Sequence, residues 1–138
     1  MQTTSELLYP MAAMFGWTFL VMLRNVQVRL AAVLRRELTN EYFELFSGGE
    51  PSEAIVKTGN HLRNLFEFPI LYYAAVLSAL ATNQSGSLFL TLAWTYVGLR
   101  VAHSMVHLTI NKVPPRFLFY FLSNIVLLVM WLQLVMPW

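Results

Sequence analysis

Four helix-length apolar stretches make up most of this 138-residue chain, and they restrict the solvent in which it can fold. They cover about 7–23, 62–82, 86–108 and 117–138, and each comes close to the ~20 mostly apolar residues that cross a bilayer core. Hydrophobic residues amount to 57% and charged residues to only 12%, more apolar surface than one soluble domain of this length could hide. The sequence therefore predicts an all-α membrane protein, a bundle of four transmembrane helices.

The chain is expected to form a single domain over 1–138, with helices over about 6–38, 52–82, 86–110 and 115–137. The connection after the first helix is acidic and contains Ser47-Gly48-Gly49-Glu50-Pro51, which is typical of a flexible loop. Ser52 is a plausible N-cap for the second helix. The paired prolines Pro114 and Pro115 end the third helix. Cysteine is absent, which excludes a disulfide framework and a cysteine nucleophile.

All nine lysine and arginine residues fall where one side of a membrane would hold them. Most lie around the first and third connections, and Arg100 lies one to two turns inside the third helix. The first six residues, the turn at 83–86 and the end of the chain carry none, so the positive-inside rule places both termini outside the cytosol. The net charge of +2 is therefore a signal of topology, and nucleic acid is not an expected partner.

Polar residues form one stripe on the second helix and one on the third, at helical spacing. The stripes are Asn60, Arg63, Asn64 and Glu67, and Tyr96, Arg100, His103, His107 and Asn111. The helices are antiparallel, so Glu67 and Arg100 are expected at the same depth, roughly 10 Å below the inner surface. Ionisable groups at that depth cost about 2.5–3.5 kcal/mol on insertion scales and face the bundle interior or a cavity.

We therefore expect Glu67 and Arg100 to face each other. Their pair either fixes the register of the two helices or belongs to a cavity for a charged ligand. The stripes hold more polar groups than one pair requires, and Pro69 is expected to kink the second helix and open room, which favours the cavity.

The run Asn64-Leu65-Phe66-Glu67-Phe68-Pro69 resembles the asparagine, glutamate and proline signature of the MAPEG family, membrane-associated proteins in eicosanoid and glutathione metabolism. Arg100, His103, His107 and Arg116 resemble that family's pattern of arginine, aromatic residues and arginine. Four helices, outward termini and a long first inner loop match as well. The resemblance implies a homotrimer that binds glutathione as co-substrate between neighbouring subunits.

The resemblance also implies a role for each matching residue. Arg116 would be the catalytic residue beside the sulfur, because a cation there lowers the thiol pKa from about 8.5 and stabilises the nucleophilic thiolate. Asn60 stands where the family commonly has arginine, for which Arg63 is a candidate substitute, and His107 stands where many members have tyrosine. The implied glutathione-binding set is Arg24 or Arg29 of a neighbouring subunit, Asn60, Arg63, Asn64, Glu67, Arg100, His103 and His107.

The function implied by the resemblance is that of a membrane-embedded glutathione transferase or peroxidase. Its hydrophobic substrate would enter from the membrane lipids. The short chain is typical of a bacterial protein, and we expect it in the inner membrane. Two alternatives stay open: a non-catalytic lipid- or ligand-binding regulatory protein of the same fold, and a haem or metal protein that uses His103 and His107. We expect no metal, a solvated His61, and Asn124 as a hydrogen-bond bridge between helices. The polar stripes stop midway along the helices, which argues against a transporter or channel.

Overall fold

The computed structural model describes residues 6–47, 49–84 and 86–136. The predicted limits of the domain at 1 and 138, and of the last helix at 137, lie outside the described residues. Within the described part every regular element is a helix, which confirms the predicted all-α class. The helices are α2 (Leu8–Leu34), α3 (Asn40–Leu45), α4 (Glu53–Leu65), α5 (Phe68–Thr82), α6 (Ser87–Leu108) and α7 (Val113–Val135).

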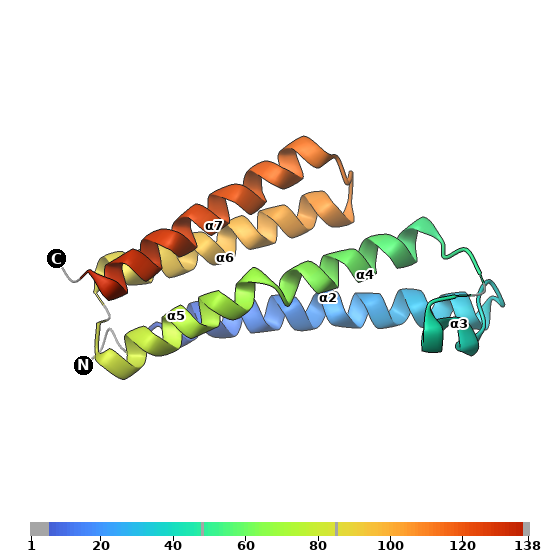
Figure 1. The fold of residues 1–138 in the computed structure, drawn as a ribbon, viewed down its shortest axis with the longest axis horizontal. Helices are drawn as coiled ribbons and strands as arrows, with labels where there is room; N and C mark the ends of the chain where they lie inside the picture. Colours follow the sequence, from blue (N-terminus) through green and yellow to red (C-terminus); the bar gives the residue numbers. More distant parts are fainter. Residues whose placement is uncertain (1–5, 48, 85, 137–138) are drawn as a thin grey trace.

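The helices form two antiparallel layers that lie side by side (Figure 1). One layer pairs α2 with α4 and α5, and the other is the shorter hairpin of α6 and α7. The most extensive packing is between α6 and α7, while α5 contacts α7, and α6 contacts both α2 and α4. α2 begins and α7 ends at the same end of the molecule, where α5 is also joined to α6.

The helix predicted over 52–82 is two helices, because the chain breaks at Phe66 and Glu67. The amides of these residues bond to the carbonyls of Arg63 at 3.0 Å and Asn64 at 3.4 Å, so α4 ends in tight three-residue turns. Pro69 then stands in the first turn of α5, where a residue without an N–H loses no helical bond. The expected kink is thus a break with a new helix start, and it lies beside the polar stripe.

The first helix ends at Leu34, four residues before its predicted end at 38. Arg36 has a left-handed backbone with φ 57°, which turns the chain out of the helix. Thr39 then accepts a hydrogen bond from the Tyr42 amide at 3.4 Å and caps the short helix α3. Part of the connection that was expected to be a flexible loop is therefore helical.

Among the described residues, three helical segments are long and apolar enough to cross a membrane: Leu8–Leu34, Glu53–Thr82 and Val113–Val135. The 22-residue α6 is long enough, but Arg100 and His103 lower its mean hydropathy. Its first half is nevertheless part of the main core, which is built from both layers. That core is formed by Leu7, Met14, Val21, Leu65, Tyr72, Ala75, Val76, Ala79, Phe89, Ala93, Tyr96, Val97, Leu127 and Met130.

Stacked tyrosines fasten α5 to α6 just beyond the kink. The rings of Tyr72 and Tyr96 lie 4.5 Å apart between centroids and only 7° from parallel. Ala75, Ala79 and Ala93 nearby are fully buried, and such small residues let membrane helices approach closely. This packed region adjoins the polar side chains, because the Tyr96 hydroxyl also accepts a hydrogen bond from Arg100.

Candidate functional site

Arg100 is completely buried and joins three helices. From α6 its guanidinium donates to the hydroxyl of Tyr96 at 3.1 Å, to Oδ1 of Asn64 on α4 at 3.1 Å, and to Oδ1 of Asn124 on α7 at 3.0 Å. It also lies over the ring of Tyr120, with Cζ 5.0 Å from the ring centroid. Asn124 is therefore a hydrogen-bond bridge between helices, as expected. All these partners are neutral, so nothing in this network balances the charge of the guanidinium.

The expected pair of Glu67 and Arg100 is wrong for a single chain. Glu67 is exposed, and the one salt bridge among the described residues joins Arg35 to Glu37 at 3.9 Å on the surface. The physical reason is the break after α4, because Glu67 lies outside the helix that carries Asn64 and so leaves the face of the polar stripe. Asn64 takes the place beside Arg100 that was expected for Glu67.

A double-mutant cycle tests this correction. The coupling energy between Glu67→Gln and Arg100→Met in thermal unfolding should stay below about 0.5 kcal/mol, since residues without contact contribute independently. A coupling energy several times larger would show that Glu67 and Arg100 interact directly, against this correction. Asn64→Ala combined with Arg100→Met is the matched control, and its coupling should be larger, because those two side chains share a hydrogen bond.

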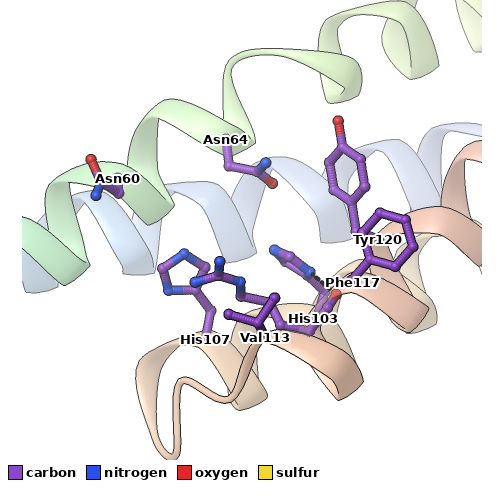
Figure 2. Close-up of a pocket in the computed structure, with 8 residues that line it drawn as sticks. Asn60, Asn64, His103, His107, Val113, Phe117 and Tyr120 are labelled. Atoms are coloured by element: carbon purple, nitrogen blue, oxygen red, sulfur yellow. Dashed lines mark hydrogen bonds between the residues drawn. The ribbon is translucent and has the colours of Figure 1, made fainter.

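A polar pocket of about 230 Å³ opens between α4, α6 and α7 (Figure 2). It brings together five residues of the predicted site: Asn60, Asn64, His103, His107 and Arg116. In Figure 2 the His103 and His107 rings rise from α6 towards the side of α4 that carries the two asparagines. The remaining walls are Val113, Phe117 and Tyr120, all from α7. No carboxylate is among these lining residues.

Arg116 occupies the first turn of α7, where the chain re-enters the bundle. Its guanidinium donates to Oδ1 of Asn111 at 2.8 Å, and its backbone carbonyl lies 2.9 Å from Nδ1 of His103. The tight turn between α6 and α7 makes both contacts possible, because it brings residue 116 back beside the end of α6. The pocket therefore holds a half-buried cation in a fixed place next to an imidazole.

Three imidazoles cluster beside this pocket, two of them in its lining. His61 lies on α4, and its ring centroid is 4.8 Å from that of His107 and 5.8 Å from that of His103. It is fully buried and both of its ring nitrogens lack a hydrogen-bond partner, so the expectation of a solvated His61 is wrong. Packing explains this, since residue 61 lies on the face of α4 turned to His103 and His107 of α6. No group of metal ligands with suitable geometry occurs in the described part of the chain.

The other predicted site residues lie outside this pocket. Arg63 is exposed on α4, and Arg29 lies over the rings of Phe43 and Phe46 at 5.6 and 5.8 Å. Arg24 lines a separate cavity of about 480 Å³. One chain thus assembles about half of the predicted set.

The aromatic wall of the pocket was not predicted. Phe117 and Tyr120 follow Arg116 by one and four residues, so a helical reading from Arg116 would have placed Tyr120 on its face. His61 precedes Asn64 by three residues and could have been found by the same spacing.

Comparison with known proteins gives one match. A model of the MAPEG family matches residues 7–136, nearly the whole chain. No curated protein and no solved structure matches it.

Proposed function

This chain belongs to the MAPEG family and is a multi-pass integral membrane protein, and on that premise we propose that it is a glutathione-dependent transferase or peroxidase. Glutathione is the co-substrate. The bound thiol is held as a thiolate, which attacks a hydrophobic electrophile or a lipid hydroperoxide that arrives from the membrane.

The observation that carries the proposal is the composition of the polar pocket. It combines a guanidinium, two imidazoles and two amides, and it contains no carboxylate. Such a pocket suits a ligand with negative charge, because its donors stabilise anions and nothing in it repels them. Glutathione supplies two carboxylates and, once deprotonated, a thiolate. Arg116 is the one lining residue with a permanent positive charge, so the sulfur belongs beside it.

The position of Glu67 supports a homotrimer with the site between subunits. This carboxylate is exposed on one chain and lies in the middle of the candidate span Glu53–Thr82. A carboxylate that faces lipid about 10 Å below the membrane surface is unfavourable by a few kcal/mol. A neighbouring copy would cover it, and the ammonium of glutathione or Arg24 or Arg29 of that copy would be its partner.

α6 is proposed as the fourth span. The helix rises about 33 Å over its 22 residues, which matches a hydrocarbon core of about 30 Å. It also connects the end of α5 to the start of α7, which lie at different ends of the hairpin (Figure 1). The basic residues concentrate away from the end at which α2 begins, which supports termini outside the cytosol in a bacterial inner membrane.

Calorimetric titration of the detergent-purified protein tests the proposal. Glutathione and S-methylglutathione should both bind saturably, since they share the peptide groups, and native mass spectrometry of the same sample should give the mass of three chains. Glutathione that binds and stays a thiol would indicate the non-catalytic ligand-binding alternative. Absence of binding by both compounds would contradict the proposal.

A further inference from the structure

We propose that His103 is the catalytic base of this site: its Nε2 takes the proton of the bound thiol while its Nδ1 stays fixed to the Arg116 carbonyl. This inference rests on the proposed function and names the group that makes the thiolate. It starts from the hydrogen bond of 2.9 Å between His103 Nδ1 and the backbone oxygen of Arg116.

That hydrogen bond decides which nitrogen of His103 carries the proton. A carbonyl oxygen can only accept, so Nδ1 must be the donor. In a neutral imidazole the other nitrogen then has the free lone pair. Nε2 of His103 is buried and has no hydrogen-bond partner, although the residue lines the pocket. An imidazole held at one nitrogen and free at the other is the arrangement of a general base.

Few other groups in the pocket can accept a proton. Carboxylates are absent from its lining, and the amides of Asn60 and Asn64 are not bases at neutral pH. His107 is the second imidazole, but its Nδ1 lacks a partner, so no hydrogen bond at that nitrogen fixes its ring. His61 does not line the pocket. His103 is therefore the one lining imidazole whose ring orientation is fixed by a hydrogen bond, and its Nε2 is left without a partner.

The charges around His103 oppose a proton on its ring unless an anion binds beside it. The groups that act on it are His61 on α4, Arg100 and His107 on α6, and Arg116 and Tyr120 on α7. Arg100 donates hydrogen bonds to three neutral acceptors, and the guanidinium of Arg116 donates to the neutral Asn111. None of these acceptors carries a negative charge. A thiolate supplies the negative charge that balances an imidazolium between two guanidiniums.

The step breaks the S–H bond and forms an N–H bond at Nε2 of His103. The electron pair of the S–H bond stays on sulfur, so a thiol and an imidazole become a thiolate and an imidazolium. After the thiolate attacks the electrophile, the imidazolium returns the proton to the leaving group or to the anionic adduct. Arg116 stabilises the thiolate throughout but takes no proton, because guanidinium has no acceptor.

Proton counting tests this inference. The proton released per thiolate formed is measured by calorimetry at pH 7 in buffers of different ionisation enthalpy, with the thiolate followed by ultraviolet absorbance and S-methylglutathione as the reference. In the wild-type protein the proton stays on His103, so release per thiolate should be near zero. Release of about one proton per thiolate would overturn the base, since the proton would then have gone to solvent.

Two variants complete the design. His103→Asn keeps a donor for the Arg116 carbonyl and removes the base, so thiolate formation in stopped flow should slow about 100-fold, the lower end of what general bases contribute. His61→Asn removes an equally buried imidazole outside the lining, and proton retention should persist. Thiolate formation at the wild-type rate in His103→Asn would overturn the inference alone, whereas no glutathione binding would overturn the proposed function with it.

Discussion

Replacement of Arg100 by methionine, a side chain of similar volume, should lower the melting temperature of the protein by about 10 °C. This is the largest effect on stability that we predict for a single substitution. The substitution leaves three acceptors without their donor: Oδ1 of Asn64, Oδ1 of Asn124 and the Tyr96 hydroxyl. At about 1 kcal/mol for each orphaned group the loss is about 3 kcal/mol. Because each acceptor lies on a different turn or helix, the loss falls on the contacts that hold α4, α6 and α7 together.

Arg63→Met is the matched control, because Arg63 is an exposed arginine on the neighbouring helix α4. Its melting temperature should change by no more than about 2 °C, as surface substitutions usually do. If Arg100→Met melts at or above the wild-type temperature, the desolvation of the guanidinium outweighs its hydrogen bonds. Arg100 would then be retained for a ligand and not for the fold.

Replacement of Arg116 by alanine should lower the kcat/KM for glutathione conjugation about 100-fold at pH 7. Without the guanidinium, the thiol pKa returns towards about 8.5, where only a few per cent is thiolate at neutral pH. The variant also loses a donor that stabilises negative charge in the transition state. The rate should be measured with a hydrophobic electrophile in detergent or in vesicles.

Lys112→Ala is the control for that variant. It removes a positive charge from the same turn, but Lys112 is exposed and does not line the pocket. Its kcat/KM should stay within about twofold of the wild-type value, because a solvated charge interacts weakly with the sulfur. An equal loss of kcat/KM in both variants would mean that the net charge of this turn determines the rate, and not the position of Arg116. The Asn111 hydrogen bond would then have no role in orienting a catalytic group.

Hydropathy and helical spacing were enough to predict the class and much of the pocket. The apolar stretches gave the helices, and the stripe on the third helix placed Arg100, His103 and His107 on one buried face. This works because a membrane helix must satisfy its own backbone, so its side-chain directions follow from residue number alone. The stripe on the second helix likewise placed the exposed Asn60 and the half-buried Asn64 at the same pocket.

The partner of Arg100 could not be predicted in this way. Helical spacing assumes that the second helix continues through Glu67, whereas Phe66 and Glu67 leave the helix ahead of Pro69. That break turns Glu67 outward and leaves Asn64 as the deepest polar residue on the face of α4. A proline indicates that a helix is broken or kinked, but it does not predict the directions of the side chains next to the break.

Helical spacing could place His61 on the face of Asn64, but the depth of its burial and the start of α3 depended on tertiary contacts. His61 is placed by its packing against His103 and His107, which come from a helix more than 40 residues away in sequence. Thr39 had the type of an N-cap residue, but the chain around it is acidic and polar, so propensity alone favoured a loop. Helical spacing within one chain cannot predict contacts between subunits. The role of Arg24 or Arg29 in the site of a neighbouring subunit is therefore a proposal.

The ultraviolet absorbance of bound glutathione tests the central claim most directly. The purified wild-type protein is titrated with glutathione at pH 7, and S-methylglutathione, which has no thiol, serves as the blank. A saturable thiolate band that is lost in Arg116→Ala and kept in Lys112→Ala is the result predicted here. Glutathione that binds to saturation without a thiolate band would contradict the claim that this pocket activates the thiol.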